Sequence, residues 1–175
     1  MRNLAISTPE LIQCSHGILF GENTPKLPAP PLLAFDEVIE ISGTGGKYGQ
    51  GFAVARKDLS DMGWVFKSHF ESDPVMPGTM MVEGLLQLTG FFGAYLGAKG
   101  TGRAAKVDDV KFLAEVMPSD KEIFYRIDVR KRSAGNSLLI TEGKVTAGGI
   151  DRTSVGQLWV IIKRTGTATP TPTVN

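Results

Sequence analysis

The stretch "SHFESDPVMPGTMMVEGLLQLTGFF", residues 68–92, joins a polar, proline-broken loop to a long apolar run. Pro77 and Gly78 interrupt any earlier helix, so the sequence predicts a helix that begins just after them. Glu83 is the single charged residue between Val75 and Ala98. A helix that is apolar nearly all round is enclosed by other elements. The stretch therefore predicts one long core helix with a lone carboxylate in it.

This run is long enough to resemble a membrane span, which requires about 20 predominantly apolar residues. Glu83 and Gln87 argue against that interpretation, because an acidic side chain inside a bilayer is costly. Gly84, Gly90 and Gly93 interrupt the run further. We therefore expect a core helix and no membrane segment.

The composition is that of an ordinary globular chain. Its 175 residues suit one domain and can bury a sizeable core. The net charge of +1 gives no indication of a nucleic-acid partner. Cys14 is the only cysteine, which excludes a disulfide within the chain and favours a reducing compartment. Residues 1–17 are too polar to resemble a secretory signal, so we expect a cytoplasmic protein.

Strand patterns also lie before the central helix. Residues 32–42 and 51–59 have the alternation of half-buried strands. The glycine-rich segment between them, residues 43–51, invites a phosphate-loop interpretation. In that motif Lys47 would be followed by Ser or Thr, and here it is followed by Tyr48. A hairpin turn between two strands is therefore the favoured interpretation.

Four further segments rich in Val, Ile, Phe and Tyr follow the helix and are separated by short turn clusters: residues 104–117, 122–132, 137–147 and 153–164. Consecutive strands with short connections pair antiparallel. The sequence thus predicts an α+β fold, an antiparallel sheet of about six strands wrapped round one long helix, in a single domain over residues 1–164. Residues 165–175 are rich in Thr and Pro, and we expect them to form a flexible tail.

His69 and Glu83 are the candidate catalytic side chains. A neutral imidazole can accept a proton near physiological pH, although a lone histidine is more often structural. A carboxyl group on an apolar helix loses hydration, which should raise its pKa and let it act as a general acid. Gln87 lies one turn after Glu83 and can hold its orientation. An ion pair with a distant Lys or Arg is the equally weighted alternative for Glu83.

Gly78 and Thr79 at the start of the helix complete the set of candidate groups. Their backbone N–H groups have no partner within the helix and lie at the positive end of its dipole. Such a position can stabilise an enolate oxygen, and glycine allows a substrate to approach the backbone closely. A base, an acid and an oxyanion site fit an elimination beside a thioester carbonyl, in which His69 removes the C2 proton and Glu83 protonates the departing 3-hydroxyl.

The segment "HFESDPVMPGTMMVEGLLQLTGFFGAYLG", residues 69–97, resembles the active-site segment of the bacterial β-hydroxyacyl-acyl carrier protein dehydratases. The likeness is closest to the β-hydroxydecanoyl dehydratase/isomerase branch and extends over residues 19–38, 102–121 and 125–132. It implies the hotdog fold and the dehydration of 3-hydroxyacyl-acyl carrier protein to the trans-2-enoyl product in fatty acid biosynthesis. We expect no cofactor and no metal, because two histidines and one cysteine offer no zinc-type spacing.

The resemblance also implies an assembly and individual roles. It implies a homodimer with the active site shared across the interface, so that His69 of one subunit would face Glu83 of the other. Val75 would orient the histidine through its carbonyl group. Gly78 would be the oxyanion glycine.

The acidic carrier protein is expected to dock on basic residues. In the related enzymes a hairpin usually carries arginines for this purpose, whereas here residues 133–137 read "SAGNS" and are neutral. The expected docking residues are therefore those just before the hairpin, namely Arg130, Lys131 and Arg132. A shifted docking site is the alternative, toward Lys106, Lys111 or Arg164.

Two departures from the decanoyl branch concern the site itself. That branch typically has Asp at the position of Glu83 and often Cys at the position of Ser68. The sequence therefore supports dehydration more firmly than isomerisation, which stays open. Two other functions are retained as alternatives: a hotdog acyl thioesterase and a non-catalytic acyl-binding hotdog protein. Residues 73–78, "DPVMPG", together with His69 and Glu83, favour the dehydratase.

Overall fold

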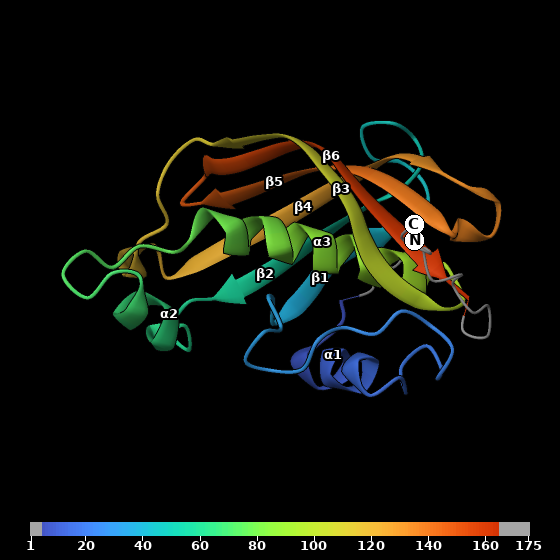
Figure 1. Cartoon of the computed structure of the whole chain (residues 1–175), viewed down its shortest axis with the longest axis horizontal. Coiled ribbons are helices and arrows are strands. Elements are labelled where there is room, and N and C mark those ends of the chain that lie inside the picture. The colour runs from blue at the N-terminus through green and yellow to red at the C-terminus, as the bar shows by residue number, and fades with distance from the viewer. Residues whose placement is uncertain (1–4, 165–175) are drawn as a thin grey trace, which may run out of the picture.

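The computed structural model describes residues 5–164 and shows one antiparallel sheet curved around one long helix (Figure 1). The sheet has six strands: β1 (Glu37–Ser42), β2 (Phe52–Asp58), β3 (Thr101–Phe112), β4 (Glu122–Arg132), β5 (Leu138–Ala147) and β6 (Ile150–Lys163). The helices are α1 (Thr8–Ser15), α2 (Gly63–Ser68) and α3 (Gly78–Tyr95), with short 3-10 turns η1 (Pro118–Asp120) and η2 (Ala134–Asn136). This architecture confirms the predicted α+β fold. The expected tail, residues 165–175, lies outside the described residues.

α3 is the predicted core helix, and it begins directly after Pro77. Its side chains toward the sheet are buried, including Met81, Leu85, Leu88, Phe91 and Phe92. One stripe at helical spacing is not buried, and its members are Thr79, Glu83, Leu86 and Gly90. We call these four residues the open stripe. The prediction of enclosure is thus right for most of the helix and wrong for Glu83, which is half-buried.

Among residues 5–164, no helix combines the length and the apolar character that crossing a membrane requires. α3 is the longest helix, with 18 residues, and it carries Glu83 in its second turn. The apolar faces of α3 pack against the sheet, as expected for a core helix.

The strand order differs from the prediction in one respect. The sheet order is β1-β2-β4-β5-β6-β3, so β3 pairs with β6 and not with its successor β4. The pairing runs from Thr101 opposite Lys163 to Phe112 opposite Thr153. β3 consequently forms one edge of the sheet. At the other edge, β1 is partly covered because Ile6 forms a bridge with Val38.

Before α3, a predicted hairpin of two strands is confirmed and a short helix was not predicted. β1 and β2 form the predicted hairpin around the glycine-rich loop. α2, residues Gly63–Ser68, was not predicted, and it buries Val65 and Phe66 while Trp64 stays 47% exposed. A helix of six residues is shorter than two turns, so its apolar positions give no periodic signal.

Gly84 provides the space that lets α3 lie against β4. A Cβ atom at Gly84 would lie 2.2 Å from Cε1 of Tyr125, whose side chain is buried. A Cβ atom at Gly90, in the same helix, would meet no atom within 4 Å. We therefore expect Gly84→Ala to be less stable than the matched control Gly90→Ala by about 1–3 kcal/mol, because both gain the same helix propensity but only the first overpacks the core.

Urea unfolding of the two variants measures this difference. If Gly84→Ala were as stable as Gly90→Ala, the tight contact between α3 and Tyr125 would be wrong.

Candidate active site

His69 is held at the end of α2 by Val75. The Nδ1 atom of His69 lies 2.9 Å from the carbonyl oxygen of Val75, and the Val75 N–H donates to the His69 carbonyl at 2.8 Å. A carbonyl oxygen can only accept, so Nδ1 carries the proton and Nε2 of the neutral ring keeps its lone pair. The ring of Phe70 stacks on the imidazole with centroids 4.0 Å apart. This geometry leaves Nε2 available as a base.

The imidazole opens on a cavity of about 560 Å³ that reaches the start of α3. Gly78 and Thr79 line the same cavity, and neither backbone N–H has an acceptor among residues 5–164. The cavity is also lined by the end of β3 and the segment after it, namely Phe112, Leu113, Ala114 and Glu115. A basic nitrogen and two polarised N–H groups therefore border one space.

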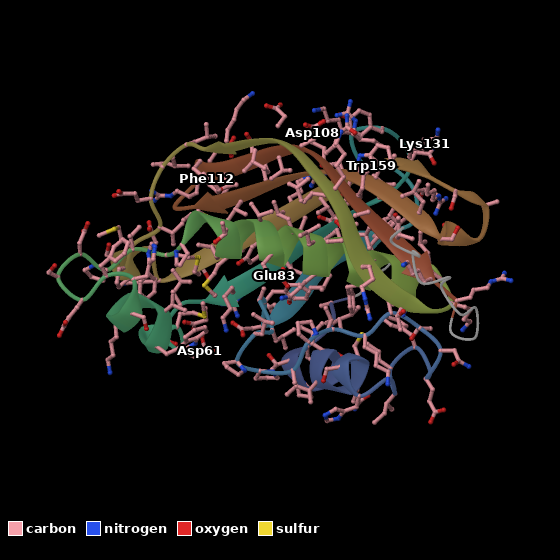
Figure 2. All side chains as sticks on the ribbon, in the orientation of Figure 1. Asp61, Glu83, Asp108, Phe112, Lys131 and Trp159 are labelled. Atoms are coloured by element: carbon pink, nitrogen blue, oxygen red, sulfur yellow. The ribbon has the colours of Figure 1, made fainter. Side chains whose placement is uncertain are left out.

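Gly78 lies against an aromatic ring. A Cβ atom at this position would lie 2.6 Å from the ring of Phe112. Phe112 is 56% exposed, and Figure 2 shows it at the end of β3 that lies near the start of α3. Glycine at position 78 therefore makes room for the ring of Phe112, in addition to the substrate contact expected from the sequence.

Glu83 and Gln87 lie together on α3, as their spacing predicts. The Gln87 Nε2 atom donates to Glu83 Oε1 and to the carbonyl oxygen of Leu32, both at 2.9 Å. The Gln87 Oε1 atom accepts from the N–H of Ala34 at 2.9 Å. Because the amide donates at one end and accepts at the other, its orientation is fixed, and it fixes the carboxylate in turn. Glu83 forms no ion pair with any residue in 5–164, so the ion-pair alternative does not hold there.

Within one subunit, His69 and Glu83 do not meet. Glu83 lines a different cavity of about 230 Å³, bordered by residues 25–28 and by residues 102–104 of β3. The two cavities share no lining residue. In residues 5–164, no group of three or more His, Cys, Asp or Glu side chains could hold a metal ion.

Arg152, which was not predicted from the sequence, supports a segment that lines the His69 cavity. Its guanidinium donates to the Glu115 carbonyl and to Asp120 Oδ1, both at 2.6 Å, and its backbone carbonyl accepts from the Leu113 N–H at 2.8 Å. These bonds fix the segment after β3, which lines the His69 cavity. Its Nε atom is buried and has no partner among the described residues. Nothing local in the sequence indicates this role, because all partners lie far away along the chain.

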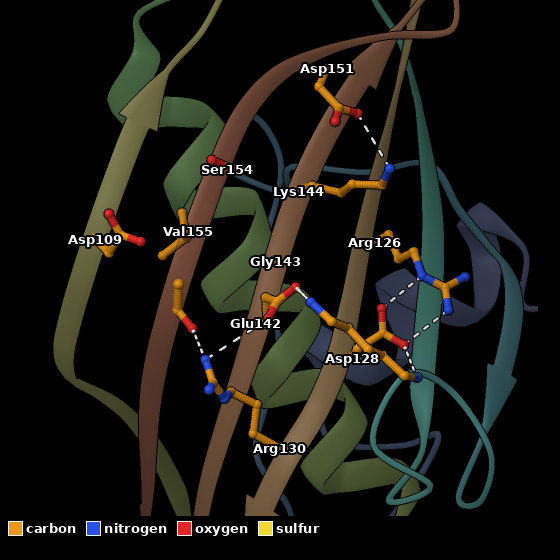
Figure 3. A pocket seen from close by; sticks show the side chains of 12 residues that line it. Asp109, Arg126, Asp128, Arg130, Glu142, Gly143, Lys144, Asp151, Ser154 and Val155 are labelled. Atoms are coloured by element: carbon orange, nitrogen blue, oxygen red, sulfur yellow. Dashed lines mark hydrogen bonds and ion pairs between the residues drawn. The ribbon is translucent and has the colours of Figure 1, made fainter.

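The expected docking residues Arg130, Lys131 and Arg132 end β4, away from the start of α3, as the position of Lys131 in Figure 2 shows. Arg130 takes part in a charge network on the outer face of the sheet (Figure 3), where it donates to the Gly156 carbonyl at 2.9 Å and lies 3.8 Å from Glu142. The cavity there, about 510 Å³, is lined by four cationic and four anionic side chains: Lys47, Arg126, Arg130, Lys144, Asp109, Asp128, Glu142 and Asp151. Its charges therefore balance.

The same network anchors the glycine-rich loop. The Lys47 N–H donates to Asp128 Oδ1 at 2.8 Å, and Arg126 donates to both oxygens of Asp128. Burial opposes ionisation of Asp128, but these hydrogen bonds and the neighbouring positive charges hold its pKa below the usual value. The loop is thus fixed by structural contacts, which agrees with the hairpin interpretation.

Comparisons with known proteins agree with this architecture. A model of the FabA-like domain family matches residues 27–152. Similar solved structures include the dehydratase heterocomplex ApeI:P from Xenorhabdus doucetiae, at 16% identity over 79% of this chain and 89% of that chain, with a TM-score of 0.63. A hypothetical thioesterase with coenzyme A from Streptococcus pneumoniae TIGR4 is similar at 12% identity over 71% of this chain and 87% of that chain, with a TM-score of 0.50. The predicted hotdog fold is confirmed, and at these identities the likeness shows the fold alone.

Proposed function

The chain belongs to the FabA-like domain family, and from this we propose that it dehydrates a 3-hydroxyacyl group carried as a thioester on acyl carrier protein, giving the trans-2-enoyl product in cytoplasmic fatty acid biosynthesis. The observation that carries the proposal is that His69 lines one cavity together with Gly78 and Thr79, whose backbone N–H groups have no acceptor among residues 5–164. The reaction breaks the C2–H and C3–O bonds, forms the C2–C3 double bond and releases water, so it needs no oxidant or reductant.

Each group has one task in this mechanism. Nε2 of His69 accepts the C2 proton, and the hydrogen bond from Nδ1 to Val75 stabilises the imidazolium that results. The N–H groups of Gly78 and Thr79 donate to the thioester oxygen as negative charge develops on it. Glu83, oriented by Gln87, protonates the 3-hydroxyl as it leaves.

We further propose that a second copy of the chain completes the site through β3. The edge of β3 is unpaired in the described chain, and Val107, Val110 and Phe112 are 36%, 37% and 56% exposed. Such an edge can pair with another strand. β3 contributes Phe112 to the His69 cavity and residues 102–104 to the Glu83 cavity. Antiparallel pairing of two β3 strands about a two-fold axis therefore brings the His69 cavity of one subunit beside the Glu83 cavity of the other.

Product analysis with a synthetic 3-hydroxydecanoyl thioester tests the proposed reaction. We expect mainly the 2-trans enoyl product, with 3-cis product slow or absent. The reason is that Glu83 is one methylene longer than the Asp of the decanoyl branch, and a displacement of about 1 Å can cost on the order of 100-fold in rate. Release of free thiol and hydroxy acid would instead identify a thioesterase. No turnover would support a non-catalytic acyl-binding protein, and 3-cis product formed as fast as 2-trans would show that the acid does not decide isomerisation.

A further inference from the structure

A series of hydrogen bonds leads from the imidazole of His69 into the buried backbone. The Nδ1–H group of His69 donates to the Val75 carbonyl at 2.9 Å. The same peptide group carries the N–H of Met76, which donates to the Val116 carbonyl, also at 2.9 Å. This peptide group is trans, so its C=O and N–H point in opposite directions. The contact with Val116 therefore fixes the direction in which the Val75 carbonyl faces the imidazole.

The series continues through a second peptide group and ends on a carboxylate. The peptide group that presents the Val116 carbonyl carries the N–H of Met117 on its other side, and this N–H donates to Oδ2 of Asp120 at 2.8 Å. The other carboxylate oxygen, Oδ1, accepts from the guanidinium of Arg152 at 2.6 Å. An unbroken series of hydrogen bonds thus joins the imidazole of His69 to the ion pair of Asp120 with Arg152.

The members of this series are shielded from solvent. Met76 and Val116 are 3% and 0% exposed, so water does not replace a partner that their backbone groups lose. The side chains of Asp120 and Arg152 are each 14% exposed, and the guanidinium also donates to the Glu115 carbonyl at 2.6 Å. From the imidazole to the carboxylate every donor points the same way, and hydrogen bonds in such a series polarise one another. A change at the ion pair is therefore transmitted to the imidazole.

Resting on the proposed function, we propose that Asp120, held by Arg152, is a positioning residue for the base His69. The ion pair carries no net charge, so its contribution is orientation: it keeps the proton on Nδ1 of His69 and the lone pair on Nε2. The competing interpretation is local. The N–H of Met117 precedes the 3-10 turn η1, and a contact that only capped this turn would have no effect on His69.

Nitrogen NMR of the imidazole rings tests the positioning without catalysis, since the chain has two histidines. At alkaline pH we expect His69 of the wild type to be in the Nδ1–H form, and the exposed His16 to show the mixture of forms of a free imidazole. In Asp120→Ala the His69 signals should move toward those of His16. The matched control is Asp128→Ala, because Asp128 likewise accepts from a backbone N–H and from an arginine, but on the outer face of the sheet. The control should leave the form of His69 unchanged.

Asp120→Asn is the second variant, because it keeps the size of the side chain and one oxygen for the Met117 N–H. We expect His69 to keep the Nδ1–H form, while the amide proton signals of Met117 and Met76 both shift, since a neutral acceptor now ends the series. Three outcomes would overturn the proposal: an unchanged His69 in Asp120→Ala, a changed His69 in Asp128→Ala, or a shift in Asp120→Asn that is confined to Met117. The last would leave Asp120 as a cap of η1.

Steady-state kinetics connect the positioning to the reaction. With the 3-hydroxydecanoyl thioester we expect kcat of Asp120→Ala to fall about tenfold, as the loss of one buried hydrogen bond allows, with KM little changed. Asp120→Asn should recover most of the wild-type kcat. A rise in KM with kcat unchanged would overturn the proposal, because the ion pair would then act only on residues 113–115, which line the cavity. If the wild type dehydrated no thioester, the proposed function would fail, while the NMR signals would still decide whether Asp120 positions His69.

Discussion

Replacing His69 by Ala is expected to lower kcat for dehydration by about 100- to 10,000-fold, which is the usual contribution of a positioned general base. The loss follows from removal of the only imidazole that borders the cavity with the free N–H groups of Gly78 and Thr79, among residues 5–164. Turnover of the 3-hydroxydecanoyl thioester measures it. The natural control is His16→Ala, because His16 is exposed and lies at the end of α1, outside the cavity.

Both histidine variants should keep wild-type circular dichroism and the same oligomeric state. Activity of His69→Ala within a few-fold of the wild type would remove His69 from the mechanism. A comparable loss in His16→Ala would show that the assay reports damage to the fold and not to the site.

Replacing Glu83 by Ala is expected to lower kcat to a similar degree, about 100- to 10,000-fold, because the 3-hydroxyl would leave without a proton donor. Glu83→Asp is the informative partner variant. It keeps the carboxyl group but draws it back from the position that Gln87 now fixes with a hydrogen bond of 2.9 Å. We expect it to retain part of the dehydration activity and to change the ratio of isomers. Near wild-type turnover in Glu83→Ala would assign the proton donor elsewhere.

Mixing the two inactive proteins tests the shared site directly. After subunit exchange, a heterodimer of His69→Ala and Glu83→Ala contains one site with both residues altered and one site with both intact. Activity should therefore return in the mixture although each parent is inactive. The absence of any recovery, once exchange has been verified by mass spectrometry, would mean that both residues act within one chain.

The long helix was predictable because the signals for it are local. Pro77 and Gly78 mark its start, and α3 begins at Gly78, within one residue of the expected position. The partner of β3 was not predictable in the same way. Short connections normally pair neighbouring strands, but residues 113–121 carry the chain away from β3, and backbone hydrogen bonds to Arg152 direct this path. Such contacts join segments that are distant in sequence and leave no local pattern.

In the candidate site, too, contacts between residues close in sequence were predictable and other features were not. His69 with Val75, and Glu83 with Gln87, are contacts between residues close in sequence, so motif spacing could anticipate them. The half-buried state of Glu83 was missed because its apolar sequence neighbours point to other sides of the helix. Thr79 and Gly90, at helical spacing from Glu83, belong to the same open stripe and were the available signal.

The hydrogen bonds between Gln87 and the backbone of Leu32 and Ala34 determine which mutations this chain can tolerate during evolution. The amide of Gln87 is held by the carbonyl of Leu32 and the N–H of Ala34, which are main-chain atoms that every residue except proline possesses in full. The side chains at positions 32 and 34 can therefore vary with little effect on the orientation of the Glu83 carboxylate. An insertion or deletion between residues 24 and 34 would instead shift both backbone groups and misplace Glu83. Natural selection should therefore preserve the length of this segment more strongly than the identity of its residues. Proline at position 34 is the exception, because it would remove the backbone N–H that donates to Gln87.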